Sequence, residues 1–333
     1  MTILVTGGAG YIGGHMALAL KESGEDYIVL DDLSNGFARA VPEGGRLIVG
    51  TTGDYESVLR IIKENNVDTI IHFAATLIMP ALYERPLEYY RINASNSRAL
   101  VQAAADGNVK NFIYSGSSAI YGNPERLPVD ESCPVKPVTP YGKSKLIMEY
   151  MLEDVSAVTD MNYVVFGYFN VAGADPKGRH GQISTKTTLL VQIAVQAALG
   201  LQKQEFEIFG TDYPTKDGTC VRDYLHVTDL IDAHLLALQY LRDGGENTKL
   251  NVGYGHGYSV RYILETAEKV TGRNFKIKEG PRRLGDPVEV VAEASLIKST
   301  LGWVPQLDNI ETIVQHAYQW ELLEQKRREA LQS

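Results

Sequence analysis

Short runs of β-branched and aliphatic residues alternate with longer amphipathic stretches through the first half of the chain. Continuous apolar runs predict strands that are buried on both faces, and helical patterns between them predict a parallel sheet. Because crossovers between parallel strands are right-handed, this order predicts a doubly wound α/β fold. The predicted strands are 2–6, 27–31, 47–49, 69–73, 111–115 and 163–166, and the longest predicted helices are 86–106 and 141–157.

The regular alternation is lost after about residue 175, where turns containing glycine and proline become frequent. We therefore expect a first domain over 1–175 and a smaller C-terminal α/β domain over 176–333. Part of 219–253 is expected to return to the first domain. The second region is predicted to contain helices around 188–200, 259–271 and 308–325 and strands at 205–209 and 275–279.

Composition narrows the functions that suit such a fold. The formal charge of -9 argues against nucleic-acid binding, since nucleic-acid binders are normally basic. The most apolar helical stretch, 189–201, is interrupted by polar residues and is too short to span a bilayer. Cys133 and Cys220 form no metal-type pair, and the seven histidines form no metal-binding motif. We therefore expect reduced thiols, no metal site and a cytoplasmic protein.

Three glycines, Gly7, Gly10 and Gly13, follow the first predicted strand and open the first predicted helix. In this setting Gly7 permits a tight turn, Gly10 lets the backbone approach a pyrophosphate, and Gly13 allows close packing of helix and sheet. The N–H groups at the helix start then face the phosphates. The spacing predicts a Rossmann-like dinucleotide site.

The residues after the next strands suit the rest of a dinucleotide. Asp31 closes the second strand, where a carboxylate binds an adenosine ribose and repels a 2′-phosphate, which favours NAD over NADP. Asp54 suits the adenine edge, and the small Ala74 and Ala75 leave room for the cofactor. Each of these residues is also compatible with an ordinary turn, cap or core position.

Tyr141 and Lys145 are four residues apart, so a helix places them on one face. A phenol with a pKa of about 10 is a poor base at neutral pH, and a neighbouring ammonium together with oxidised nicotinamide favours the phenolate. Such a tyrosine takes a proton from a hydroxyl as hydride leaves its carbon. Ser117, after the fifth strand, can share that proton, although serines in turns and surface Tyr/Lys pairs are both common.

Together these motifs resemble the extended short-chain dehydrogenases/reductases, and later motifs resemble, more narrowly, the UDP-glucose 4-epimerase family among them. The later motifs are 168–174, 210–215, 217–219, 221–224 and 281–286. The resemblance runs nearly end to end. It implies an NAD-dependent isomerase of carbohydrate and galactose metabolism, which interconverts UDP-glucose and UDP-galactose through a transient 4-keto sugar. It also implies a homodimer that pairs the helices 86–106 and 141–157.

The resemblance assigns roles to matching positions. Ser117, Tyr141 and Lys145 are the implied catalytic residues, with Tyr141 as the base and Lys145 as its electrostatic partner. The implied NAD-binding residues are Gly7, Gly10, Tyr11, Ile12, Gly13, Asp31, Asn35, Asp54, Tyr55, Phe73, Ala74, Ala75, Asn93, Tyr141, Lys145 and Tyr168. The implied substrate-binding residues are Ser117, Tyr141, Asn170, Thr188, Arg222, Tyr224, Arg283, Asp286 and Val290, with the arginines bonded to the UDP diphosphate.

Five positions depart from the pattern of that family. Leu77 stands where many members have a lysine near the nicotinamide and pyrophosphate, so one cationic contact is missing. Gly116 replaces a usual serine, Gly167 a usual arginine, and Thr188 a frequent asparagine. Val290 replaces a bulky tyrosine beside the sugar. The smaller side chain predicts space for an N-acetyl group, so a UDP-N-acetylhexosamine is an alternative substrate.

Two other functions suit the same fold. A nucleotide-sugar 4,6-dehydratase needs an acid and a base after the serine, whereas Ser118 and Ala119 follow Ser117 here. A non-catalytic NAD-binding protein is the second alternative, because a fold does not determine a function. Such proteins can lose one or more of the three catalytic side chains, and all three are present in this chain.

Overall fold

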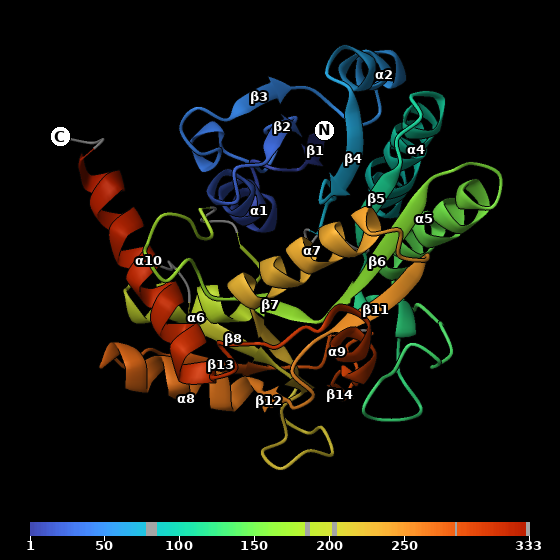
Figure 1. The fold of residues 1–333 in the computed structure, drawn as a ribbon. Helices are drawn as coiled ribbons and strands as arrows, with labels where there is room; N and C mark the ends of the chain where they lie inside the picture. Colours follow the sequence, from blue (N-terminus) through green and yellow to red (C-terminus); the bar gives the residue numbers. More distant parts are fainter. Residues whose placement is uncertain (78–84, 184–186, 202–204, 284, 331–333) are drawn as a thin grey trace.

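The computed structural model describes residues 1–77, 85–183, 187–201, 205–283 and 285–330, and a seven-stranded parallel sheet lies at its centre (Figure 1). The order β11-β6-β5-β4-β1-β2-β3 reverses direction at β1, as in doubly wound sheets. The predicted fold class is therefore confirmed. The strands are β1 (Thr2–Thr6), β2 (Asp26–Asp31), β3 (Arg46–Val49), β4 (Val67–His72), β5 (Asn111–Ser115), β6 (Asn162–Tyr168) and β11 (Thr248–Val252).

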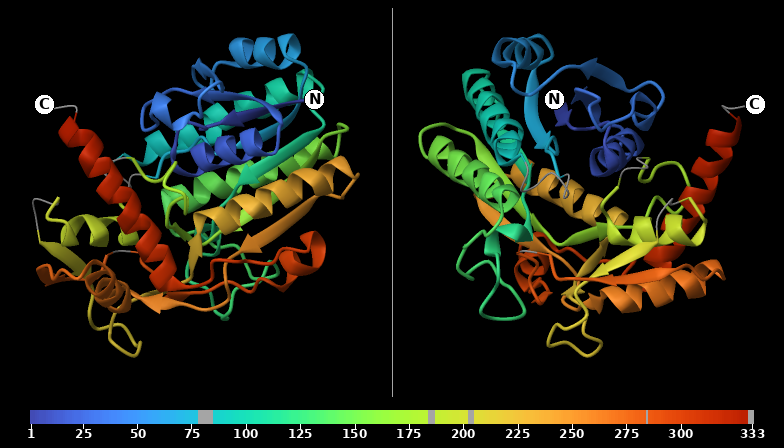
Figure 2. Two further views of the ribbon diagram at one scale, coloured as in Figure 1. Left: turned by 60° about the vertical axis from the view of Figure 1, so that its left-hand side comes forward. Right: turned by 180° about the vertical axis from the view of Figure 1, so that it is seen from behind.

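Helices cover both faces of this sheet (Figure 2). Successive side chains of a strand point to opposite faces, so Ile3 and Val5 join one apolar cluster while Leu4 joins another. The first cluster includes apolar residues of α1 (Tyr11–Glu22) and α7 (Val227–Arg242). The second includes those of α2 (Tyr55–Glu64), α4 (Ser97–Asp106) and α5 (Pro140–Ser156).

The predicted helix 86–106 is one continuous helical stretch with an irregular middle. It consists of α3 (Pro86–Tyr89), the π-helical segment η3 (Tyr90–Asn96) and α4. A π turn widens the helix locally and changes the direction of its side chains, and such turns are frequent at functional sites. In this chain the π segment contains Asn93, one of the predicted cofactor residues.

The second half of the chain adds small sheets and a group of helices. The helices α6, α8 and α10 contact one another, and their apolar residues continue the cluster on the α1 side of the large sheet. The division at residue 175 stays a prediction, although β11 and α7 bring 227–252 back to the large sheet. No helix within the described ranges is both long and apolar enough to cross a membrane. The elements of this half are β7 (Asn170–Ala172), α6 (Leu190–Ala198), β8 (Phe206–Phe209), β9 (Val221–Arg222), β10 (Tyr224–His226), β12 (Tyr258–Ser259), α8 (Val260–Thr271), β13 (Ile277–Gly280), β14 (Glu289–Val290), α9 (Ser295–Leu301) and α10 (Ile310–Ala330).

Candidate active site

The predicted site residues gather at the carboxyl ends of the central strands, where parallel sheets bind their ligands. Gly7 follows β1, Asp31 ends β2, Phe73 follows β4, and Tyr168 ends β6. Ser117 lies two residues beyond β5, at the start of the short 3-10 helix η4 (Ser118–Tyr121). The order of strands therefore brings together residues that are far apart in the sequence.

The glycine loop between β1 and α1 has no room for larger side chains. Gly7 has φ +72°, and a Cβ there would lie 2.6 Å from the backbone nitrogen of Ala74. A Cβ on Gly13 would lie 2.2 Å from the carbonyl oxygen of Gly7. No side chain within the described ranges caps α1 at Gly10, so the first N–H groups of the helix are left for an anion. The loop therefore fits the diphosphate of a dinucleotide.

Asp31 is buried and braces this loop. Its carboxylate accepts hydrogen bonds from the backbone N–H groups of Ala9 (2.9 Å) and Leu33 (2.9 Å). Burial raises the pKa of Asp31, and these two hydrogen bonds act in the opposite direction. A Cβ on Gly36 would lie 2.7 Å from the carboxylate, so that glycine keeps the space above Asp31 open. Asp31 thus has a structural role at the position where a ribose would bind.

Tyr141 and Lys145 lie on the first turns of α5, which begins with a Thr139 cap and Pro140. Lys145 is only 3% exposed, and its Nζ donates a hydrogen bond to the carbonyl oxygen of Ser115 (2.9 Å). The same Nζ lies 5.8 Å from the centre of the Tyr141 ring. Tyr141 is also hydrogen-bonded to the side chain of Ser117. The three predicted catalytic side chains are therefore brought together.

Burial opposes charge on both members of the Tyr141–Lys145 pair. It raises the pKa of Tyr141 to about 12, and the hydrogen bond with Ser117 acts in the opposite direction. It lowers the pKa of Lys145 to about 7, and the charge of Glu149 acts in the opposite direction. The phenol is therefore neutral at neutral pH in the protein alone. A further positive charge beside the ring would be needed to make it a base.

Asn93 connects the π segment to both sides of this site. Its Oδ1 accepts a hydrogen bond from the N–H of Thr76 (2.8 Å), and its Nδ2 donates to the Oγ of Ser144 (3.1 Å). Ser144 in turn donates to the carbonyl oxygen of Tyr141 (2.8 Å). The amide therefore holds the segment after β4 against the catalytic helix, and its contact with a cofactor stays a prediction.

Tyr168 is fixed by a histidine that the sequence did not reveal. His234 on α7 donates from Nδ1 to the carbonyl oxygen of Leu230, so its Nε2 accepts the hydrogen bond of the Tyr168 hydroxyl (2.5 Å). Burial lowers the pKa of His234 to about 4, which keeps the ring neutral. The ring of Phe73 lies 5.1 Å from that of His234. Nothing in the local pattern of α7 distinguishes this histidine from a residue of the core.

Several predicted cofactor residues have a structural partner, and their cofactor contacts stay predictions. The Tyr11 hydroxyl donates to the carbonyl oxygen of Gly173 (2.7 Å). Asp54 caps α2 by accepting the N–H of Ser57 (3.2 Å). The Tyr55 hydroxyl donates to Asp106 (2.7 Å). Three further predicted residues follow β1 or β4 at the carboxyl edge of the sheet: Ile12 and Ala74 are half-buried, and Ala75 is exposed. Asn35 is exposed in the loop after β2.

Apart from Ser117 and Tyr141, the predicted substrate residues come from four short segments. Arg222 and Val290 are opposite one another in β9 and β14, and Arg222 forms an ion pair with Asp286 (3.5 Å). The guanidinium of Arg283 lies 3.7 Å from the centre of the Phe209 ring. The other three predicted substrate residues differ in exposure. Asn170 is exposed at the start of β7, Thr188 is half-buried, and Tyr224 is buried in the core.

Two of the departures from the family pattern have a physical reason. A Cβ on Gly116 would lie 2.7 Å from the carbonyl oxygen of Phe166, so the backbones of β5 and β6 come too close for a side chain. A Cβ on Gly167 would lie 2.5 Å from Oδ1 of Asn251. That amide accepts a hydrogen bond from the Tyr121 hydroxyl (3.0 Å), so Gly167 makes room for the group that holds Tyr121. Leu77 is exposed.

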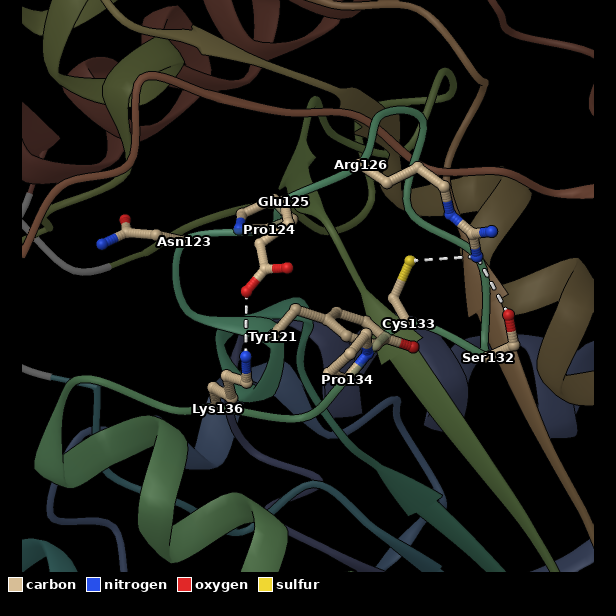
Figure 3. Close-up of a pocket in the computed structure, with 9 residues that line it drawn as sticks. All are labelled: Tyr121, Asn123, Pro124, Glu125, Arg126, Ser132, Cys133, Pro134 and Lys136. Atoms are coloured by element: carbon tan, nitrogen blue, oxygen red, sulfur yellow. Dashed lines mark hydrogen bonds and ion pairs between the residues drawn. The ribbon is translucent and has the colours of Figure 1, made fainter.

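A separate pocket of about 290 Å³ lies in the loop after η4 (Figure 3). Arg126 points across it to Cys133 and Ser132, and Lys136 pairs with Glu125. None of its lining residues belongs to the predicted site. They are Tyr121, Asn123, Pro124, Glu125, Arg126, Ser132, Cys133, Pro134 and Lys136.

Comparisons with known proteins agree with this geometry. The model of the NAD-dependent epimerase/dehydratase family matches residues 3–253. The chain is 45% identical to a UDP-glucose 4-epimerase of Azospirillum brasilense, over 96% of this chain and 91% of the relative. Its structure resembles that of UDP-glucose 4-epimerase from Brucella ovis in complex with NAD (TM-score 0.91, 38% identity, 96% and 97% of the two chains). It also resembles the UDP-Glc/GlcNAc 4-epimerase from Campylobacter jejuni (TM-score 0.83, 39% identity, 97% and 99%).

Proposed function

Because the chain belongs to the NAD-dependent epimerase/dehydratase family, we propose that it inverts C4 of a UDP-hexose and interconverts UDP-glucose and UDP-galactose. One observation carries this proposal. Ser117, Tyr141 and Lys145 meet at the carboxyl end of a doubly wound sheet, beside a glycine loop that fits a dinucleotide. The relatives from Azospirillum brasilense and Brucella ovis, which match nearly the whole chain, are named UDP-glucose 4-epimerases.

The side chains of the chain divide the work of the reaction. When bound, NAD would supply the hydride acceptor and donor that inversion at C4 needs. Tyr141 takes the O4 proton in the first half and returns it in the second. Ser117 shares this proton through its hydrogen bond to the phenol. The Lys145 ammonium stabilises the phenolate.

The same proposal assigns the binding residues. Gly7, Gly10 and the start of α1 would hold the diphosphate of NAD, and Asp31 would bind the adenosine ribose. Arg222 and Arg283 would make charge-assisted hydrogen bonds to the UDP diphosphate. The remaining predicted cofactor and substrate residues are proposed in the roles that the family resemblance implies.

A UDP-N-acetylhexosamine is a second candidate substrate, and Val290 is the observation that favours it. The valine is buried in a small apolar cluster with Ile120, Tyr121 and Phe169. Ile120 and Tyr121 belong to η4, the short helix that directly follows Ser117. A small side chain at this position leaves more space beside the sugar than a tyrosine would. A 4,6-dehydratase is disfavoured, because η4 begins with Ser118 and Ala119 and offers no carboxylate after Ser117.

Incubation of the purified protein with UDP-galactose and no added NAD tests the proposed activity. We expect UDP-glucose to form and NAD to be released when the protein is denatured, because the cofactor is regenerated in every turnover. A stable keto product would instead indicate a 4,6-dehydratase. Bound NAD without any conversion of UDP-sugars, even when NAD is added, would indicate a non-catalytic protein.

We also propose that the protein is a cytoplasmic homodimer. Cys133 and Cys220 are both buried free thiols, as is usual in a reducing compartment. The helices α3 and α5 contact each other and present exposed apolar side chains, among them Leu87, Ile147 and Tyr150. Exposed apolar residues on neighbouring helices support a subunit interface on this side of the molecule.

A further inference from the structure

A buried carboxylate lies one helical turn beyond Lys145. Glu149 is only 1% exposed, and its Oε1 makes no hydrogen bond within the described residues. Its Oε2 lies 3.5 Å from the Nζ of Lys249 on β11. Glu153, one turn further along α5, lies 3.6 Å from the same Nζ, but its side chain is 60% exposed. Glu149 is thus the buried member of a carboxylate pair that shares one lysine.

Burying a carboxylate with an oxygen that lacks a hydrogen bond costs free energy, so its presence needs a reason. Residues four apart on a helix face the same way, which places Glu149 beside Lys145. The Lys145 ammonium is bonded to the Ser115 carbonyl, a neutral acceptor. Among the described residues, Glu149 is the charged group that raises the pKa of Lys145 against the effect of burial.

The tyrosines and the histidine around this pair carry no charge at neutral pH. Burial raises the pKa values of the tyrosines and lowers the pKa of His72 to about 3. Glu131, on the loop after η4, accepts the backbone N–H of Asn251 (2.6 Å). The titratable groups that remain are Lys145, Glu149, Lys249, Glu153 and Glu131. The neutral groups are Tyr141 on α5, Tyr114 on β5, Tyr121 on η4, Tyr163 on β6 and His72 on β4.

We propose that Glu149 is a positioning residue for the reaction: its carboxylate, kept ionised by Lys249, holds Lys145 in the charged form that Tyr141 needs. This inference rests on the proposed epimerase function. Burial also raises the pKa of Glu149 to about 7, opposed first by Lys249, so the lysine on β11 decides whether the carboxylate is charged. The result is a row of alternating charges, Lys249, Glu149 and Lys145, that ends at the catalytic phenol.

The variant Glu149→Gln tests the proposal, and Glu153→Gln is its matched control. The turnover number for UDP-galactose is measured against pH for the parent and both variants. Without the carboxylate, Lys145 loses its proton at lower pH, so the alkaline limb of the Glu149→Gln profile should move down by about one pH unit. At pH values on the alkaline limb, the turnover number of Glu149→Gln should be about tenfold below that of the parent, and its KM should be unchanged. The Glu153→Gln profile should coincide with that of the parent.

A second measurement does not depend on turnover. The tyrosinate absorbance of the holoenzyme is titrated, and the same titration of Tyr141→Phe is subtracted to isolate Tyr141. In the Glu149→Gln background, the ionisation of Tyr141 should move to higher pH. If Glu149→Gln fails to fold, Lys249→Met takes its place and should shift both measurements in the same direction.

Parent-like results for Glu149→Gln in both measurements, or for Lys249→Met where it replaces that variant, would overturn the proposal. Equal shifts for Glu149→Gln and Glu153→Gln would also overturn it, because they would show that the loss of any nearby negative charge has the same effect. An inactive parent would instead refute the proposed function, and the tyrosinate titration would still test Glu149.

Discussion

At the scale of single residues, the chemistry of Tyr141 and Lys145 follows from burial and from a few neighbours. Burial makes the phenol a weaker acid and the amine a weaker base, so both groups resist charge in the protein alone. When NAD is bound, its positively charged nicotinamide would favour the phenolate. We therefore expect Tyr141 to become a base mainly when NAD is bound.

Val290→Tyr tests whether the space beside the sugar determines specificity. We expect the variant to lose at least about tenfold in kcat/KM for UDP-N-acetylglucosamine while UDP-glucose is converted at a similar rate, because only the N-acetyl group needs that space. Val288→Tyr, at an exposed position two residues earlier, is the control and should change neither rate. The account of specificity fails if the parent ignores the N-acetylated sugar, or if Val290→Tyr affects both substrates equally.

At the scale of elements, the turn from β1 to α1 shows how closely backbone segments pack around a binding loop. At Gly13 the obstacles to a side chain are backbone atoms of Gly7 and Gly8, which cannot rotate away. We expect Gly13→Ala to distort the loop, lower the melting temperature and reduce the NAD that copurifies with the protein by at least about tenfold. The cofactor content of the purified variant, measured by absorbance after denaturation, checks this prediction.

Gly50→Ala is the control for that substitution. A Cβ there would meet only the end of the Leu30 side chain, at 3.3 Å, and this side chain can adjust. The control should keep the NAD content of the parent. A Gly13→Ala protein with full NAD content would show that close packing at the loop is not needed for cofactor binding.

The elements also show what a single sequence can reveal. Each of the first six strands of the sheet contains a short apolar run, and helical patterns separate these runs, so the local pattern predicts the strands and the fold class. For β11 the sequence predicts only that part of 219–253 returns to the first domain, because this strand lies at the edge of the sheet in a region without regular alternation. The two-residue strands β9, β12 and β14 depend on tertiary pairing and leave no local pattern.

The same distinction applies to the site. The glycine loop and the pair of Tyr141 and Lys145 have a fixed local spacing, so they could be singled out from the sequence. His234, Glu149 and Lys249 could not, because a buried polar residue on a helix or an edge strand resembles any other until the fold brings its partner close. Asp54 is indicated by its position after a strand and Asn93 by the family resemblance, and the structure adds local hydrogen bonds that the sequence does not indicate.

At the scale of the whole molecule, one apolar cluster joins the large sheet to the helices of the second half. It contains residues of β1, α1 and α7 together with residues of α6, α8 and α10. These elements are labelled in Figure 1. The two halves of the chain therefore share a core, and the site lies on elements from both. A shared core of this kind keeps the predicted cofactor and substrate residues in a fixed relation.

The proposed dimer is a property of the whole molecule and is tested by its mass in solution. The parent is expected to sediment at twice the 36.7 kDa of one chain. The double variant Ile147→Arg and Tyr150→Arg should sediment as a monomer, because it places charges in the proposed apolar interface. Val158→Arg, at an exposed position beyond the end of α5, should remain a dimer. A monomeric parent, or a dimeric double variant, would contradict the proposed interface.

The rate at which Tyr141→Phe converts UDP-galactose tests the central claim most directly. The variant is compared with the parent at equal NAD content and after its melting temperature has shown that it is folded. The account predicts a loss of at least about a hundredfold, because the phenyl ring neither accepts nor returns the O4 proton. A folded, NAD-loaded Tyr141→Phe protein that forms UDP-glucose as fast as the parent would contradict it.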